Sequence, residues 1–370
     1  MENIRDRVVR EFLTQVKIDS HSFKEKKMFD YLEKRLRDLG LEVERIPYTT
    51  EENISSENMI AKLPANTPNK KRLFFDAHVD TVEPGIGVTP IVDGDVIRSS
   101  GQTILGGDDK AGSSALVIAF EELVHREHGD VVCVFTSAEE VGLVGVRYLD
   151  FSRLNADYGF VLDSHGSVGG IVVAAPTQYQ YEIFITGKAS HAGIAPEAGK
   201  NAIVAAGELL TRLPQGRLNR YTVANVGLID GGKATNIVAD ACHIQGEFRC
   251  HRERDCEKLQ RFIERLVHRR FFQKKVEDVN VCFKKVYSGF RYDEESPLIQ
   301  LASQALQALG ITPRLEWTGG GSNTNIYNQQ GIPTVNLSVG MEEVHSLQEY
   351  IRIDDLVKLT HLIVKMCELC

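Results

Sequence analysis

Five side chains of metal-binding type each stand at the end of an apolar, strand-like run of this sequence. Carboxylate and imidazole ligands suit zinc, manganese or cobalt, and two such ions about 3.5 to 4 Å apart can activate water and polarise the bond it attacks. Two imidazoles and three carboxylates are enough for a hydrolytic site of that kind. The five are His78 in LFFDAHVD, Asp108 in LGGDDKAG, Glu140 in VVCVFTSAEE, Asp163 in YGFVLDSHG and His345 in GMEEVHSLQEY.

His78 and Asp80 are two residues apart at the end of a predicted strand, so their side chains point to the same face. A carboxylate that accepts one imidazole N–H fixes the tautomer that offers the other nitrogen to a metal. Asp80 is therefore predicted to orient His78. The alternative is that His78 ends a strand and Asp80 begins a turn.

Asp108 follows two glycines and precedes a predicted helix. An aspartate there is also a good N-cap for the free amides of a helix. The functional alternative is a bridge between two metal ions, with the glycines allowing a close approach of the backbone.

The segment SAEEVG has two explanations as well. Ser137 and Glu140 have the S-x-x-E spacing of a capping box. Two adjacent acids can also divide roles, with Glu140 binding metal and Glu139 acting as the general base that takes the proton of the attacking water.

Asp163 ends a very apolar strand, where ligands gather in open α/β sheets, although an aspartate that begins a loop is the ordinary explanation. His345 follows two acids in a loop and, alone, is an ordinary surface histidine. Each of the five residues thus has a structural explanation. Their segments, however, are expected to meet at one sheet edge, and coincidence in all of them is improbable.

The elements that must position these residues follow an α/β pattern. Two helices are predicted in the first forty residues, followed by strands at 42–46, 59–63 and 73–78, a helix beginning near residue 110, and near-continuous apolar strands at 131–136 and 158–162. Such strands are typical of a parallel or mixed sheet covered by helices on both faces.

A different order begins near residue 178. Strand 181–186, helix 202–213, strands 222–229 and 242–249, helix 253–270 and strand 276–287 give βαββαβ, the ferredoxin-like unit. Helix 298–309, strand 334–338 and helix 354–368 then return to the first style. The sequence predicts a catalytic domain of residues 1–176 and 291–370, with residues 177–290 inserted.

Bulk composition excludes several classes of protein. With 370 residues, two domains are expected. Forty-three Lys and Arg against 51 Asp and Glu give a net charge of -8, which provides no basic surface for nucleic acid or anionic lipid. The N-terminus lacks an apolar signal core, no run is of membrane-spanning length, and seven scattered cysteines indicate reduced thiols, so a cytoplasmic location is predicted.

At HVDTV, LGGDDKAG, SAEEVG, LDSHG and HSLQEY the chain resembles the co-catalytic metallopeptidases and amidohydrolases that include peptidase T, carboxypeptidase G, aminoacylase and acetylornithine deacetylase. Peptidase T-like proteins are the most similar, through LGGDDKAG, RLEWTGGGSNTN and H-x-x-x-E-Y. The resemblance implies two zinc ions per subunit, a cis peptide between Asp108 and Asp109, and an inserted domain that dimerises and acts as a lid. It further implies His78 and Asp163 on one zinc, Glu140 and His345 on the other, Asp108 bridging, Asp80 orienting and Glu139 as base.

Within the predicted lid, GKASHAGIAPEAGKNA resembles the family segment whose histidine stabilises the oxyanion, here His191. GGKATNIVAD and GEFRC resemble the segments that hold a substrate carboxylate, here through Asn236 and Arg249. An arginine fork matches a carboxylate bidentately, so a substrate with a free C-terminus is implied.

One position departs from the family pattern. Relatives often place an acid after the Gly-Gly turn, whereas GGGSNTN has Asn323. Backbone amides near Gly320 and Gly321 are still expected to meet substrate. The same turn lacks the lysine and the strand-to-helix placement of a phosphate-binding loop.

The sequence therefore predicts a cytoplasmic, homodimeric di-zinc hydrolase acting on short peptides, with cobalt or manganese as alternative metals. A tripeptide aminopeptidase is the leading subclass. A deacylase of N-acyl amino acids or a carboxypeptidase uses the same chemistry and is the alternative. A non-catalytic relative that binds peptide or metal is the alternative of another class, and the retained Glu139 argues against it.

Overall fold

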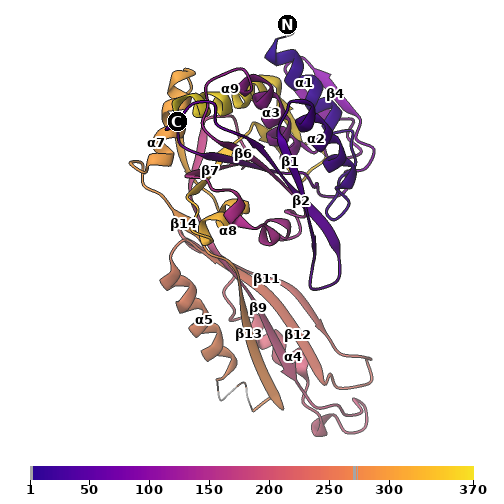
Figure 1. Ribbon diagram of the computed structural model, residues 1–370. Helices are drawn as coiled ribbons and strands as arrows, with labels where there is room; N and C mark the ends of the chain where they lie inside the picture. The colour runs from indigo at the N-terminus through magenta and orange to yellow at the C-terminus, as the bar shows by residue number, and fades with distance from the viewer. Residues whose placement is uncertain (1–2, 270–271, 273) are drawn as a thin grey trace. The chain divides into compact units, whose positions relative to one another are not determined.

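The computed structural model describes residues 3–269, 272 and 274–370 (Figure 1). The chain forms two compact units. The larger unit comprises Met1–Val173, Arg291–Trp317 and Ser322–Cys370, and the smaller unit comprises Ala174–Phe290 and Thr318–Gly321.

The larger unit is built on a mixed sheet whose centre is parallel. Strand β3 pairs in parallel with β6 and β7, and β16 pairs in parallel with β7. These four strands are almost entirely buried, as continuous apolar runs predict for a sheet covered on both faces. The sheet order is β1-β2-β6-β3-β7-β16-β8-β14, with β15 paired to β8. The bounds are β1 Glu42–Thr49, β2 Ser55–Leu63, β3 Leu73–His78, β6 Val131–Thr136, β7 Tyr158–Ser164, β8 Gly170–Ala175, β14 Phe290–Arg291, β15 Arg314–Trp317 and β16 Thr334–Ser338.

Helices cover this sheet from both sides. Helices α1, α3 and α9 pack on one another, α3 also contacts β3, and α8 contacts β7 and β16 (Figure 1). The core between the layers is aliphatic and aromatic, and includes Phe12, Phe75, Leu116, Phe160 and Leu362. The bounds are α1 Ile4–Gln15, α2 Lys26–Asp38, α3 Gly107–Leu123, α7 Pro297–Ala308, α8 Asn323–Gln329 and α9 Ile353–Leu369, with short 3-10 turns at Gly145–Tyr148 and Phe151–Arg153.

A small second sheet in the larger unit has the order β17-β18-β5-β4. Sequence patterns did not predict it, because its strands are two to four residues long and too short to show a period. It joins the segment around residue 95 to the segment that follows His345. The bounds are β4 Pro90–Asp93, β5 Val96–Ser99, β17 Met341–Glu342 and β18 Tyr350–Arg352.

The smaller unit has the predicted ferredoxin-like order. Its sheet runs β10-β11-β12-β9-β13, so the four long strands follow the antiparallel arrangement 4-1-3-2 of that fold, extended by β10. Alternate side chains such as Tyr181, Ile183 and Ile185 are buried with those of helices α4 and α5, while the intervening residues are partly or fully exposed. The bounds are β9 Thr177–Thr186, α4 Ala202–Leu210, β10 Gly216–Asn219, β11 Thr222–Gly231, β12 Ala241–Cys250, α5 Glu253–Val267 and β13 Asp278–Tyr287, with a 3-10 turn at Pro196–Ala198.

The predicted fold class, a mixed α/β domain with an inserted ferredoxin-like unit, is confirmed. The short strand β10 was not predicted because all four of its residues are exposed and show no alternation. The helix predicted to end at residue 270 ends at Val267, and residue 270 itself lies outside the described part of the chain. Among the described helices, none combines the length and the apolar character that crossing a membrane requires.

Candidate metal centre

The parallel strands bring three of the predicted ligands to one edge of the larger unit's sheet. His78 is the last residue of β3, Glu140 follows the end of β6, and Asp163 is near the end of β7. His78 pairs in register with Thr136, the last residue of β6. Because carboxyl ends of parallel strands share one edge, residues from three separate segments meet there.

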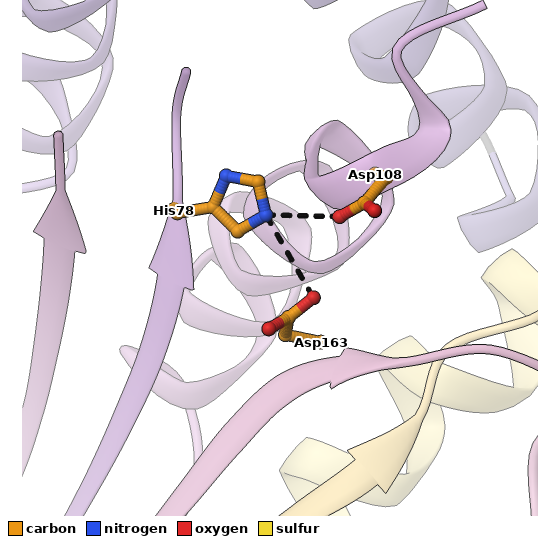
Figure 2. A group of neighbouring side chains, drawn as sticks. All are labelled: His78, Asp108 and Asp163. Carbon is orange, nitrogen blue, oxygen red and sulfur yellow. Dashed lines mark hydrogen bonds and ion pairs between the residues drawn. The ribbon is translucent and has the colours of Figure 1, made fainter. Parts of the chain in front are cut away.

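Three of the predicted ligands, His78, Asp108 and Asp163, form one group, with the two carboxylates facing the His78 imidazole (Figure 2). Its Nε2 lies 2.9 Å from Oδ1 of Asp108 and 3.7 Å from Oδ1 of Asp163. Its Nδ1 lies 3.0 Å from the backbone carbonyl oxygen of Asp80. A carbonyl oxygen only accepts, so Nδ1 carries a proton and Nε2 is the nitrogen that faces the carboxylates.

A second group joins Asp108 to Glu140 and His345. Nε2 of His345 lies 3.2 Å from Oδ2 of Asp108 and 2.9 Å from Oε1 of Glu140. Asp108 thus belongs to both groups, with Oδ1 facing one imidazole and Oδ2 facing the other. A carboxylate shared in this way is the arrangement that a bridging ligand needs.

The charges of the cluster favour a bound cation. Burial raises the pKa of Asp163 to about 7, and repulsion from Asp108 and Glu140 adds to the effect. Burial would lower the pKa of His78, but its hydrogen bonds to Asp108, Asp163 and Asp80 raise it well above its usual value. Hydrogen bonds to Asp108 and Glu140 raise the pKa of His345 to about 10. Crowded carboxylates therefore hold positive charge at this site, and a divalent cation on these oxygen and nitrogen donors would satisfy them.

The carboxylate of Asp80 was predicted to orient His78, but the closer acceptor of His78 Nδ1 is the backbone carbonyl oxygen of Asp80. Its carboxylate Oδ1 is 3.4 Å from His78 Nδ1, whereas its closer contacts are to the loop after β6. Oδ1 accepts a hydrogen bond from the backbone amide of Glu139 at 3.0 Å, and Oδ2 accepts one from the amide of Glu140 at 3.2 Å. Ser22 Oγ donates to Oδ2 at 2.7 Å. The buried carboxylate therefore positions the predicted base and a predicted ligand through their backbone.

Glu139, the predicted base, directly precedes the predicted ligand Glu140 in the sequence, and the charges of the cluster act on its carboxyl. Burial raises the pKa of its carboxyl, and the negative charges of Asp163 and Glu140 add to this. The residue before it, Ala138, has a left-handed backbone with φ 50, and His345 has φ 61. Non-glycine residues seldom adopt this conformation, and those that do are concentrated at functional sites. The peptide between Asp108 and Asp109 is cis, as the family resemblance implies.

The remaining predicted site residues lie in the smaller unit. His191 and Asn236 are neighbours there, because Ala192 N–H donates to the Asn236 carbonyl at 2.9 Å and His191 forms a bridge with Ile237. Both side chains are exposed. Arg249 pairs with Glu247, with Nε of the arginine 2.9 Å from Oε1 of the glutamate. Nη1 of Arg249 lies 3.5 Å from the carbonyl oxygen of Gly319.

Gly320 and Gly321 belong to Thr318–Gly321, a short segment of the smaller unit that is separated in sequence from its main part, Ala174–Phe290. Gly320 N–H donates to Thr318 Oγ1 at 3.1 Å, so this amide already has a partner in its own turn. At Gly321 a Cβ would come within 2.2 Å of the Tyr287 ring, which is why the position requires glycine. Packing against Tyr287 thus explains this glycine without a substrate.

Asn323 has a structural role. It is 1% exposed, and its Nδ2 donates to Oδ1 of Asp76 at 3.0 Å and to Oγ1 of Thr136 at 2.8 Å. Tyr327 donates to the other oxygen of Asp76 at 2.7 Å. The amide that replaces an acid is therefore the donor that a buried carboxylate on β3 requires.

Two buried glutamates near the cluster were not predicted. Glu25 Oε1 accepts hydrogen bonds from the backbone amides of Ala138 at 3.0 Å and Phe23 at 2.7 Å. Glu349 binds the segment that carries Asp108. Glu349 had a sequence signal, because it is the acid of the H-x-x-x-E-Y motif that begins at His345. Glu25 had none, since its partner is 113 residues away.

An α/β unit with two groups of side chains that could hold metal and share one carboxylate, in a chain that also contains a ferredoxin-like unit, is the arrangement expected of a metallopeptidase-type protein. Comparison with known proteins agrees. A family model for the peptidase dimerisation domain matches residues 177–274, and one for peptidase family M28 matches residues 58–192.

Three relatives align over nearly the full length of the chain. The uncharacterized protein YqjE of Bacillus subtilis is 37% identical, with 98% of each chain covered. The crystal structure of aminopeptidase PepT from Bacillus cereus has 37% identity and a TM-score of 0.88, with 98% of each chain covered. That of a tripeptidase from Staphylococcus aureus has 31% identity and a TM-score of 0.91, covering 99% of this chain and 98% of that one. The chain belongs to the family of the peptidase T-like aminopeptidases and tripeptidases, which confirms the family predicted from the motifs.

Proposed function

We propose that the protein hydrolyses amide bonds in short peptides with two zinc ions per subunit, as a tripeptide aminopeptidase. The observation that carries the proposal is the placement of the two Asp108 oxygens against two different imidazoles, one from β3 and one from the segment after β17. The names of the aminopeptidase and tripeptidase relatives support the substrate class.

In this proposal His78 and Asp163 hold one ion, Glu140 and His345 hold the other, and Asp108 holds both. Bound there, the ions would lower the pKa of a water molecule and polarise the carbonyl of the scissile bond. Cobalt and manganese suit the same donors.

The chain's own residues supply the proton transfers. Glu139 accepts the proton of the attacking water on a carboxylate oxygen and delivers it to the leaving nitrogen. Burial raises the pKa of this carboxyl above its usual value, which strengthens it as an acceptor of the water proton. Asp80 keeps Glu139 in place through the backbone amide.

We assign substrate contacts to the smaller unit. His191 stabilises the oxyanion by donating a hydrogen bond, and Asn236 and Arg249 bind the substrate carboxylate. Arg249 is held by Glu247, which leaves its guanidinium fixed but partly neutralised. Amides near Gly320 and Gly321 are weaker candidates, since Gly320 N–H already has a partner.

We further propose that the active form is a homodimer joined through the smaller unit, where the dimerisation-domain model matches. A cytoplasmic location agrees with the seven free cysteines of the described residues. Light scattering of the purified protein, which measures its molar mass in solution, tests whether it is a homodimer.

The experiment that tests the function uses a tripeptide of three different residues. An aminopeptidase releases the N-terminal residue first, loses activity on the N-acetylated tripeptide, and is inactivated by a chelator and restored by zinc. Elemental analysis of the purified protein should give two metals per chain. Release of the C-terminal residue first would assign the carboxypeptidase alternative, and preferred hydrolysis of N-acetyl amino acids would assign the deacylase.

A metal-loaded protein that hydrolyses none of these substrates would support the non-catalytic alternative. The Glu139→Gln variant is the matched control, because it should keep its metals and lose turnover. Equal activity in both proteins would contradict the role of Glu139 as the general base.

A further inference from the structure

The carboxylate of Glu349 accepts hydrogen bonds from three backbone amides of the segment that carries Asp108. Its Oε2 accepts from Leu105 at 2.7 Å and from Gly106 at 2.8 Å. Its Oε1 accepts from Asp108 at 3.0 Å. Glu349 is 1% exposed, and residues 105–108 are all buried. Buried amides require acceptors, and the two oxygens of this single side chain accept hydrogen bonds from three of them.

The local backbone does not define the conformation of this segment. Although α3 begins at Gly107, Asp108 has φ -80 and ψ 104 and Asp109 has φ -119 and ψ 39, neither of which is helical. Regular helix hydrogen bonds therefore do not orient Asp108. A contact from outside the helix is needed to hold it.

The two glycines of LGGDDKAG fit this contact. Gly106 has φ 76, which favours glycine. A Cβ on Gly107 would come within 3.0 Å of Oε1 of Glu349. The close backbone approach that the glycines allow is therefore an approach to the Glu349 carboxylate.

Glu349 also links the two ligand groups through the chain. It follows His345 by four residues, and its own N–H donates to the Ser346 carbonyl at 3.2 Å, which closes the turn between them. The segment that brings His345 to the cluster thus also brings the acceptor for the Asp108 amide.

We propose that Glu349 is a positioning residue of the metal centre, which sets the backbone of Asp108 so that one carboxylate oxygen faces His78 and the other faces His345. It acts through the backbone of Asp108. The inference rests on the proposed function only in taking Asp108 as a metal ligand.

Two variants test it by different routes. Glu349→Gln keeps the shape but has one accepting oxygen, so at least one of the three amides loses its partner. Gly107→Ala keeps the carboxylate but places a Cβ 3.0 Å from its Oε1, so the carboxylate must shift by a few tenths of an ångström relative to the amides. Gln348→Ala, an exposed neighbour, is the control. For each, zinc affinity of the metal-free protein is measured by calorimetry, amide hydrogen exchange at residues 105–108 by mass spectrometry, and kcat and KM with a tripeptide.

Both Glu349→Gln and Gly107→Ala should weaken zinc binding by roughly 10- to 100-fold, the usual effect of removing a partner of a ligand. Exchange at residues 105–108 should be faster, and kcat should fall more than KM rises. Gln348→Ala should match the wild type. Unchanged zinc affinity in both variants would overturn the inference, including the case in which they are merely less heat-stable. A wild-type protein that binds zinc without hydrolysing peptides would end the proposed function and leave this test intact.

Discussion

The residues proposed to bind metal and those proposed to bind substrate are held very differently by the fold. In the larger unit, the proposed ligands His78 and Asp108 and the neighbouring Asp80 are almost fully buried, and each has several polar partners. Of the five proposed ligands, His345 is the exposed one, and its imidazole is held by Asp108 and Glu140. In the smaller unit, His191 and Asn236 are exposed. The buried group is preorganised by its neighbours, which favours a fixed metal geometry, whereas exposed side chains are available to meet a ligand.

This contrast predicts two kinds of mutational effect. Changes to the proposed ligands and their buried partners in the larger unit should alter metal content or protein stability, whereas a change to the proposed base Glu139, which is not a ligand, should alter turnover alone. Changes in the smaller unit should alter turnover and leave the metals in place. The four predictions below test that division, beginning with the largest effect.

Asp108→Ala should lose both metals, because the residue belongs to both ligand groups. Activity should fall by at least roughly 10³-fold, since a catalytic metal contributes several kcal/mol to transition-state stabilisation. Elemental analysis after dialysis measures the metals. Two retained ions per chain would contradict the bridging role.

Glu139→Gln should retain both metals and its fold. Turnover should fall by roughly 10² to 10⁴, the usual loss for a general base. Steady-state kinetics beside elemental analysis separates this outcome from that of Asp108→Ala. Activity near that of the wild type would remove Glu139 from the mechanism.

His191→Ala should lower kcat by about 10²-fold, the lower end of the effect of removing one oxyanion donor, without change in zinc content. A rise in KM alone would instead indicate a role in substrate binding. Loss of zinc in this variant would contradict the prediction that changes in the smaller unit leave the metals in place.

Asn323→Asp should destabilise the protein by about 2 to 4 kcal/mol at pH 8, because it places a second buried carboxyl against Asp76. Burial already raises the pKa of Asp76 to about 6. A raised pKa means that the folded state binds this proton more tightly than the unfolded state, so stability is lost as pH rises through about 6. In the variant a second carboxyl lies in the same buried site. The variant's loss of unfolding free energy relative to the wild type should therefore be smaller at pH 5, where a buried carboxyl is protonated, than at pH 8.

Chemical denaturation at the two pH values measures this effect. Asp76→Asn combined with Asn323→Asp exchanges the two partners and should recover most of the stability. The matched control is Asn236→Asp in the smaller unit, an exposed site where the change should be within about 0.5 kcal/mol. An equal loss at both positions would refute the distinction between a buried network and an exposed site.

Elements with a strong period were predicted closely. The fully buried runs at β3, β6 and β16 have the predicted bounds, because a continuous apolar strand between polar turns is visible in the sequence. The small sheet of β4, β5, β17 and β18 was missed, since its strands are short and pair segments far apart in sequence. No local pattern carries such a pairing.

The same distinction applies to the site. The types of the five ligand residues and their positions at strand ends were readable from the sequence. A bridging role for Asp108 was one of two explanations left open by its segment, and the family resemblance implied it. Which oxygen faces which imidazole depends on where His78 and His345 lie in space. The amide contacts of Glu25 and Glu349 were not predicted, because they join residues 113 and 241 to 244 positions apart.

Apolar periodicity and side-chain chemistry are local properties, so the amino-acid sequence was enough to predict the α/β class, the inserted ferredoxin-like unit and the donor types of a candidate metal site. Two features became apparent only in the folded chain: which oxygen of Asp108 faces which imidazole, and the hydrogen bond from Asn323 to the buried Asp76. Those outcomes depend on hydrogen-bond geometry between distant segments, which exists only once the chain has folded.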